Sequence, residues 1–428
     1  MTQEFEGLAF QAANILLPKD CEYSKWAVVA CDQYTSQPEY WQRVSDYVGS
    51  APSALHLVLP ESCLEGPDVE TDIMEINNNM STYLRHGRFK ELPHALIYVE
   101  RTLSSGKVRR GLVGRADLER YDYEAGAQSV IRATEGTVMS RIPPRVAVRK
   151  NAMIELPHIM LLCDDPQKQI IEPLAQRTDR MELLYDFDLM EDGGHLKGWL
   201  LDEDSVAQVA GGFRKLFGDN DALCDRYGLP RGSQVFQFAV GDGNHSLATA
   251  KECYERQKRL VKQDEWDKLP ARWALCELVD LHDESLEFEP IHRVVFHVQP
   301  RALLDALLKA YPGAYEGEGE GHVLRYVTAA GEGAITIPKP KLQLPVASLQ
   351  TFLDDYLVEH GGSVDYIHGE DVARDLGCRS GNIAFLLEAM EKEALFPTVI
   401  HDGALPRKTF SMGEANDKRF YLEARKIR

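Results

Sequence analysis

Short apolar runs alternate with segments of helical periodicity along most of this 428-residue chain. The run at 26–31 has the length and β-branched content of a buried strand. Two further apolar runs, 95–101 and 109–115, flank a Ser-Ser-Gly turn and predict a hairpin. Hydrophobic residues at helical spacing predict helices at 40–48, 68–85 and 204–217. Strands that alternate with helices and also form hairpins indicate the α/β class in its mixed α+β form, with mixed rather than purely parallel sheets.

Weaker local signals complete the predicted organisation. They predict a short strand at 56–59, a helix at 169–174 and a helix at 349–359 that Ser348 caps. The Glu-Gly repeat at 316–321 is the best linker candidate on composition. The resulting division is an N-terminal α/β domain at 1–125, a central domain at 126–315 and a C-terminal α/β region at 322–428.

The stretch 235–256 reads as an apolar strand, a polar turn and an amphipathic helix. The turn consists of Gly241, Asp242, Gly243, Asn244, His245 and Ser246. Its glycines allow backbone angles that are closed to other residues, and the first N–H groups of a helix have no partner within the helix. Together with the positive end of the helix dipole, such a turn attracts a phosphate or carboxylate. The alternative left open is a structural corner in which a polar side chain only caps the helix.

The stretch 131–150 is a net basic patch in an otherwise acidic chain. Pro143 and Pro144 prevent one continuous helix there, so the arginines do not form a simple helical stripe. Arg141 and Arg145 are candidates for an anion clamp, because the guanidinium fork matches phosphate oxygens. The alternative is a set of solvated arginines paired with the many carboxylates of the chain.

Charge and cysteine usage narrow the classes of function. The formal net charge of −19 argues against bulk binding to nucleic acid or to an anionic membrane, where phosphates require a basic face. The eight cysteines are scattered without metal-type spacing, which is typical of reduced thiols. The N-terminus lacks a signal pattern and no apolar run could span a bilayer. We expect a cytoplasmic protein that acts on a small molecule, and a homo-oligomer is left open.

Five motifs in this order carry a resemblance that covers most of the chain: ACDQYTSQ, TEGT, GDGNHS, PIHR and LPRKT. They resemble the bacterial and archaeal family called domain of unknown function 1015. Its central turn usually reads D-G-H-H-R, so Asn244 and Ser246 depart from the family here. Its H-E-x-T element corresponds to the segment 134–137, with Thr134 in place of the histidine. Two further elements of the family are matched, one by His292 and Arg293 and the other by Lys408 and Thr409.

The D-G-H-H-R turn in turn resembles the phosphate-handling motif of the ParB/sulfiredoxin-like fold, which includes free-serine kinases. That resemblance implies a phosphotransferase of serine metabolism that uses ATP, ADP or pyrophosphate as donor, with Mg²⁺. We therefore expect a small-molecule kinase rather than a nuclease. A non-catalytic phosphate-ligand sensor and a phosphatase of the same metabolite remain as alternatives.

Phosphoryl transfer needs positioning and charge neutralisation, and these needs assign roles to the candidate residues. Glu135 is the candidate general base, since it lies in the motif that combines a carboxylate with arginines; its alternative is a salt bridge. Asp242 is the candidate Mg²⁺ ligand, and His245 would donate to a phosphoryl oxygen. The candidate phosphate- or substrate-binding residues are Gly241, Gly243, Asn244, Ser246, Thr137, Arg141, Arg145, His292, Arg293 and Lys408.

Overall fold

The computed structural model describes residue 5 and residues 7–124 and 126–428, which form two compact units. Unit 1 comprises Met1–Leu286 together with Glu414–Arg428, and unit 2 comprises Glu287–Gly413. These divisions differ from the three consecutive segments predicted from the sequence. The difference has two causes: strands from both of the first two predicted segments share one sheet, and the C-terminal segment returns to unit 1, which no local pattern indicates.

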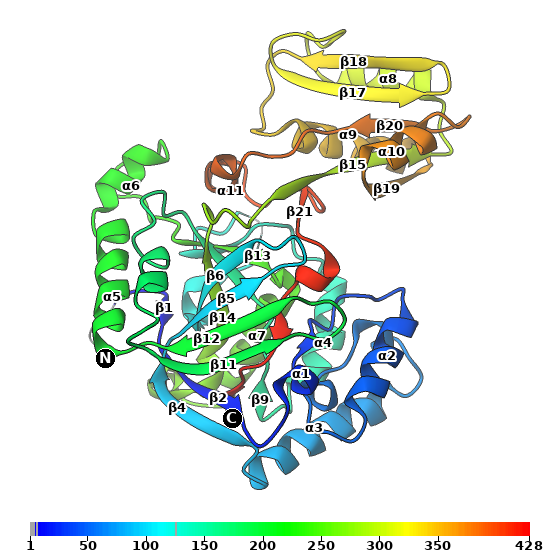
Figure 1. Ribbon diagram of the computed structural model, residues 1–428. Coiled ribbons are helices and arrows are strands. Elements are labelled where there is room, and N and C mark those ends of the chain that lie inside the picture. Colours follow the sequence, from blue (N-terminus) through cyan, green and yellow to red (C-terminus); the bar gives the residue numbers. More distant parts are fainter. Residues whose placement is uncertain (1–4, 6, 125) are drawn as a thin grey trace. The chain divides into compact units, whose positions relative to one another are not determined.

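A mixed ten-stranded sheet forms the centre of unit 1 (Figure 1). Across the sheet the order is β11 (Glu182–Asp188), β12 (His195–Leu200), β5 (Ile97–Thr102), β6 (Val108–Asp117), β14 (Trp273–Asp280), β10 (Met160–Cys163), β13 (Phe238–Asp242), β8 (Ile131–Ala133) and β7 (Tyr121–Asp122), and β1 (Phe10–Gln11) pairs with β6. The β10–β14, β13–β8 and β7–β8 pairs are parallel and the others are antiparallel. The predicted hairpin is β5–β6, and the predicted mixed α/β class is confirmed.

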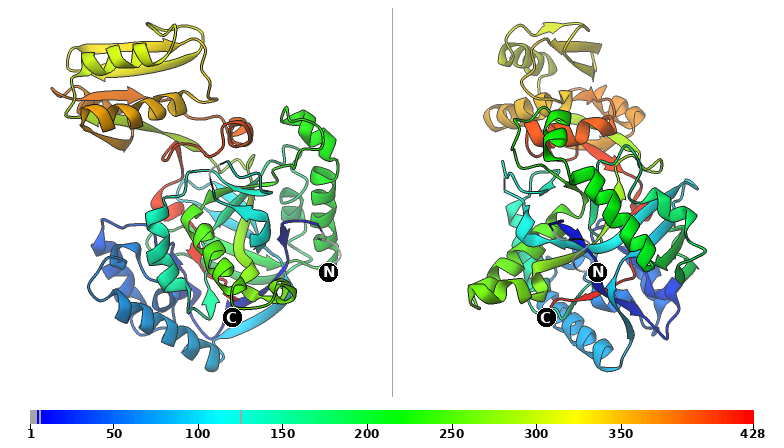
Figure 2. Two further views of the ribbon diagram at one scale, coloured as in Figure 1. Left: turned by 180° about the vertical axis from the view of Figure 1, so that it is seen from behind. Right: turned by 90° about the vertical axis from the view of Figure 1, so that its left-hand side faces the viewer.

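Helices pack on the sheet, and a hydrophobic cluster lies on each of its two faces. Ile97 and Val99 belong to one cluster and Tyr98, between them, to the other, as the alternation of side chains along a strand requires. The α-helices are α1 (Tyr23–Trp26), α2 (Pro38–Val48), α3 (Val69–Arg85), α4 (Ile142–Arg149), α5 (Glu203–Phe217), α6 (Asn220–Arg226) and α7 (Asn244–Lys258). The predicted helices at 40–48, 68–85 and 204–217 correspond to α2, α3 and α5. Figure 2 shows α4 and α7 side by side, where Ile142 and Val146 pack against Ala248 and Cys253.

The C-terminal segment, red in Figure 1, threads through unit 1 beside the N-terminal elements. Its strand β22 (Phe420–Tyr421) pairs with β3 (Val28–Val29), and β23 (Arg425–Lys426) pairs with β9 (Ile154–Glu155). A further two-stranded sheet joins β2 (Ala13–Pro18) and β4 (Phe89–Ala95). Arg419 is buried and pairs with Glu277 at 2.9 Å and with Glu423. Buried ion pairs therefore hold the segment inside the unit.

Unit 2 is built on an antiparallel sheet of seven strands. The strands are β16 (Tyr315–Glu316), β18 (Gly331–Ile337), β17 (His322–Thr328), β20 (Ile383–Leu386), β15 (Phe288–Phe296) and β19 (Ser363–His368), with β21 (Phe410–Met412) also paired to β15. Its α-helices are α8 (Pro300–Ala310), α9 (Pro345–His360), α10 (Glu370–Gly377) and α11 (Leu395–His401).

Short 3₁₀ helices occur in both units. Among the described residues they are η2 (Ala54–Leu57), η3 (Glu61–Cys63), η4 (Leu118–Arg120), η5 (Met139–Arg141), η6 (Glu172–Gln176), η7 (Gln263–Lys268), η8 (Pro270–Arg272), η9 (Lys392–Ala394) and η10 (Ala415–Asp417).

Several local predictions were wrong. The segment 56–59 is not a strand, since its first half belongs to η2, and only η6 forms near the predicted helix at 169–174. Ser348 is not a cap: α9 begins at Pro345, and the buried hydroxyl of Ser348 lies 3.0 Å from His322 Nδ1. The Glu-Gly repeat is no linker, because it joins β16 to β17 within unit 2. At the Glu-Gly repeat, strand pairing on both sides overrides the local propensity. Among the described residues, no helix is both long and apolar enough to cross a membrane.

The buried pairs of Arg419 yield a stability prediction. In Arg419→Met the Glu277 and Glu423 carboxylates lose a buried partner, so the free energy of unfolding of unit 1 should fall by about 3 kcal/mol. The control Arg43→Met removes an exposed pair with Glu191 and should cost less than about 1 kcal/mol. All five tryptophans lie in unit 1, so urea unfolding followed by tryptophan fluorescence reports on this unit. Equal losses in the two variants would contradict the prediction.

Candidate functional site

The predicted strand–turn–helix is present, and its turn is tighter than the sequence suggested. Gly241 and Asp242 belong to β13, so Gly243 alone separates the strand from α7. Gly243 has a φ of +79°, and a Cβ there would lie 3.1 Å from the Cα of Ile159. Both the left-handed backbone and the close approach of Ile159 require glycine at this position. Gly241 has no such requirement, because it adopts ordinary strand geometry.

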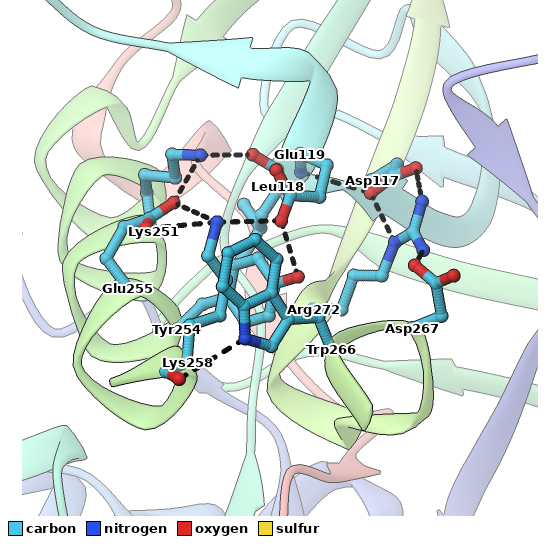
Figure 3. Close-up of polar contacts among 10 residues, drawn as sticks. All are labelled: Asp117, Leu118, Glu119, Lys251, Tyr254, Glu255, Lys258, Trp266, Asp267 and Arg272. Atoms are coloured by element: carbon cyan, nitrogen blue, oxygen red, sulfur yellow. Dashed lines mark hydrogen bonds and ion pairs between the residues drawn. The ribbon is translucent and has the colours of Figure 1, made fainter. Parts of the chain in front are cut away.

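Polar contacts along its C-terminal half hold α7 in place (Figure 3). Tyr254 and Lys258 both donate to the Glu119 carboxylate, at 2.7 and 2.8 Å, and Lys251 donates to the Leu118 carbonyl at 2.9 Å. Trp266 donates to the Lys258 carbonyl at 3.2 Å. These contacts lie away from the turn, so they fix the direction of the helix N-terminus without occupying it.

His245 is a neutral imidazole in positively charged surroundings. Its Nε2 accepts a hydrogen bond from the Val138 N–H at 3.3 Å, which leaves the proton of the neutral ring on Nδ1. Burial, followed by the charges of Arg145 and Arg141, lowers the pKa of His245 to about 4, and Asp32 opposes this shift. The structure thus brings the predicted arginines and the predicted histidine together.

Asp242 faces a lysine that the sequence had indicated only as part of a basic tail. Its carboxylate lies 3.3 Å from Lys418 Nζ and accepts the Gly243 N–H at 2.8 Å. Burial opposes ionisation, but Lys418, His158 and the Gly243 N–H keep the pKa of Asp242 below its usual range. The described residues contain no group of three His, Cys, Asp or Glu side chains arranged for a metal ion. With Asp242 already paired, this donor set does not fit a resident Mg²⁺ ion.

A second layer of polar residues supports the turn. Ser246 Oγ lies 3.0 Å from His158 Nε2, and His158 Nδ1 lies 2.6 Å from the Tyr421 hydroxyl. Tyr421 also contacts Cys31 Sγ at 3.1 Å, and Asp32 lies 3.9 Å from His158. Sequence reasoning missed His158 and Tyr421 altogether. The available signal was a histidine at the start of an apolar strand, but no local pattern connects it to residue 421.

The loop after β8 carries the other predicted residues of unit 1. Thr134 donates to the Val240 carbonyl at 2.7 Å and accepts from Asn244 Nδ2 at 3.4 Å, which ties the loop to the turn. Glu135 lies in the same loop. Thr137 Oγ1 and Asn244 Oδ1 are buried without a hydrogen-bond partner in the described structure. Such atoms are costly unless a ligand or water satisfies them.

The remaining predicted residues belong to unit 2. Arg293 is fully buried, and its guanidinium donates to the carbonyls of Ile291, Lys408 and Arg407 at 2.6–2.9 Å. His292 Nδ1 accepts the Leu387 N–H at 3.1 Å. These contacts stabilise the interior of unit 2, and the phosphate contact of His292, Arg293 and Lys408 stays a prediction.

A separate acidic cluster lies at the opposite end of β10 from the turn. Asp280, at the end of β14, and Glu172 face each other, with Asp165 beside them. Burial, followed by the charge of Glu172, raises the pKa of Asp280 to about 9, because the two carboxyl groups hold one proton between them. The raised pKa favours the protonated form of Asp280, in a cluster that lies apart from the turn.

The chain belongs to the family described as Protein of unknown function (DUF1015), whose model matches residues 15–356, and the family predicted from the motifs is confirmed. A comparison with curated proteins gives no significant match.

Distantly similar solved structures include a free serine kinase mutant in complex with AMP, at 12% identity and a TM-score of 0.40, covering 75% of this chain and 93% of that one. A conserved hypothetical protein from Pyrococcus furiosus is also 12% identical, with a TM-score of 0.36 and coverages of 74% and 95%. C-terminally truncated SbnI from Staphylococcus aureus is 9% identical, with a TM-score of 0.35 and coverages of 72% and 82%. At these scores no site residue is transferred.

The neutral state of His245 can be tested by titration. The ring should stay unprotonated until the pH approaches about 4, whereas an unfolded chain takes up this proton near pH 6.5. The stability contributed by this group should therefore fall as the pH drops from about 6.5 towards 4. Arg145→Gln removes one cause and should raise the pKa of His245, and Arg256→Gln, at the far end of α7, should not. NMR of the imidazole nitrogens measures both; equal pKa values in the two variants would contradict the assignment.

The Asp280 pair predicts a pH dependence of the opposite sign. The folded chain keeps a proton up to about pH 9 that an unfolded aspartate releases near pH 4. Stability from this pair should therefore fall as the pH rises between about 4 and about 9. Asp280→Asn should remove this slope and be more stable than the unsubstituted protein at pH 9. Thermal unfolding between pH 5 and pH 9 tests this, and an unchanged slope in the variant would refute it.

Proposed function

We propose that unit 1 is a phosphotransferase whose site is the N-terminal turn of α7. The observation that carries the proposal is the convergence of this helix N-terminus with Arg141 and Arg145 around the neutral His245. The N-terminus of a helix contributes about half a positive charge, and its first N–H groups point outward. Glu61 pairs with Arg145 and holds it beside the turn, and a helix N-terminus with arginines close to it favours a phosphate ligand.

The residues at and around the turn have roles that follow from their contacts. The first helical hydrogen bond joins the Leu247 N–H to the Gly243 carbonyl, so the N–H groups before it are available to phosphoryl oxygens. His245 donates from Nδ1, since its Nε2 already accepts from Val138. Arg141 and Arg145 neutralise charge on the transferred group. Thr137 and Asn244 supply buried polar atoms that a ligand would satisfy.

Proton transfer from an acceptor hydroxyl is assigned to Glu135, which lies in the loop that Thr134 ties to the turn. Asp242 orients Lys418 towards the phosphate through their ion pair. Since the site does not fit a resident metal ion, any Mg²⁺ would arrive bound to the phosphates of the donor.

The finer part of the proposal is a free-serine kinase that uses a nucleotide or pyrophosphate donor. It rests on the likeness of the 242–246 turn to the motif of those enzymes. A non-catalytic phosphate sensor would need the same positive groups but not Glu135, and a phosphatase would use the same groups in reverse. These alternatives differ in turnover, which decides between them.

Phosphorus NMR tests the proposal directly. The purified protein is incubated with Mg²⁺ and L-serine and, in separate samples, with ATP, ADP or pyrophosphate. We expect a phosphoserine signal, reduced about 10²- to 10⁴-fold in Glu135→Gln and strongly reduced in His245→Ala. Each variant is first checked for folding by tryptophan fluorescence.

Binding of inorganic phosphate gives a second readout that does not depend on turnover. Arg145→Gln should weaken it about tenfold, and Arg256→Gln, an equal change of charge on the exposed end of α7, should leave it unchanged. Phosphate binding without turnover in any mixture would refute the enzyme and favour the sensor, and release of phosphate from phosphoserine would favour the phosphatase. Absence of phosphate binding would refute the site itself.

A further inference from the structure

A cavity of about 150 Å³ lies in unit 1 beside the N-terminal turn of α7. Most of its wall is apolar, and it comes from η2 and the segment after it, from α3, from α4 and above all from the segment 152–159. The principal apolar residues are Leu57, Leu59, Leu64, Met80, Val148 and Leu156. Protein interiors are close-packed, so an apolar space of this size forfeits contacts that the core would otherwise make.

The cavity adjoins the proposed phosphate site, with which it shares Ser246 and Arg145. Ser246 and Thr249, one turn apart on α7, line it, and so does His158, the partner of Ser246. Arg145 lines it as well, and the same guanidinium lowers the pKa of His245. Arg145 is held at this position by an ion pair with Glu61, another lining residue. A ligand whose phosphate lies on the turn therefore has an apolar space within reach.

We propose that this cavity binds a flat ring carried by the phosphorylated ligand, so that the substrate or donor combines a phosphate with an aromatic ring system. The inference rests on the proposed function and adds the class of ligand to it. An engineered apolar cavity of about 150 Å³ holds benzene, which sets the scale. Free serine has a single side-chain carbon and leaves this space unfilled. The ring thus belongs either to the base of a nucleotide donor or to an aromatic acceptor.

The test compares three probes by calorimetry: inorganic phosphate, phenyl phosphate and AMP. Phenyl phosphate should bind about tenfold tighter than inorganic phosphate, because it also removes a ring from water. If the ring is a nucleobase, AMP should also bind at least tenfold tighter than inorganic phosphate. If the ring belongs to an acceptor, phenyl phosphate should bind tighter than inorganic phosphate and AMP should not.

Two variants fill the cavity without touching the turn. Val148→Phe, on α4, and Ala152→Leu, beyond the end of α4, both add volume to its wall. Each should abolish the advantage of the ring-bearing probe and leave the affinity for inorganic phosphate within about twofold. Leu260→Phe adds an aromatic ring at an exposed site and should change neither affinity. The second filling variant keeps the test valid if the first one does not fold.

The outcomes separate this inference from the proposed function. If inorganic phosphate binds and ring-bearing phosphates bind no tighter, the cavity proposal is overturned and the phosphate site stands. A ring advantage that survives in both filling variants also overturns it, because the ring then lies elsewhere. If inorganic phosphate itself does not bind, the proposed function fails first.

Discussion

The buried ion pairs of Arg419 are the constraint on which the rest of unit 1 depends. Arg419 joins Glu277 in the middle of β14 to Glu423 in the C-terminal segment, and all three side chains are almost fully buried. Charges so deep in a protein are tolerable only when they are paired. The segment therefore has to enter the unit at this point, and its neighbours in the chain follow. Lys418 reaches Asp242, and Tyr421 reaches His158.

Electrostatics distinguishes the turn of α7 from the other polar clusters of the unit. At the acidic cluster, Asp280 and Glu172 relieve their repulsion by holding a proton. At the turn, burial and then the positive charges of Arg145 and Arg141 keep His245 neutral. The first arrangement is complete without a ligand. The second leaves positive groups and the unpartnered Thr137 hydroxyl, which can donate a hydrogen bond to a bound anion.

Local sequence was informative wherever the cause of a structure is local. Periodicity predicts α2, α3 and α5, because each has one apolar face that must be buried. The Ser-Ser-Gly turn predicts the β5–β6 hairpin, and Gly243 predicts the sharp corner before α7. The same reasoning failed at 316–321, where glycine and glutamate suggested a linker but the chain passes between paired strands.

The sequence by itself determined the mixed α/β class, the family and the strand–turn–helix, and it supplied the residue types on which the proposed phosphate site rests. It did so because propensity, glycine geometry and motif order are properties of neighbouring residues. Only the tertiary structure decided that residues 414–428 belong to the same unit as the turn, and that Lys418 and Tyr421 complete it. The same holds for the cavity, whose wall draws on segments from Cys31 to Tyr421. Contacts between residues so distant in the chain are set by packing and by buried charge, which no local pattern encodes.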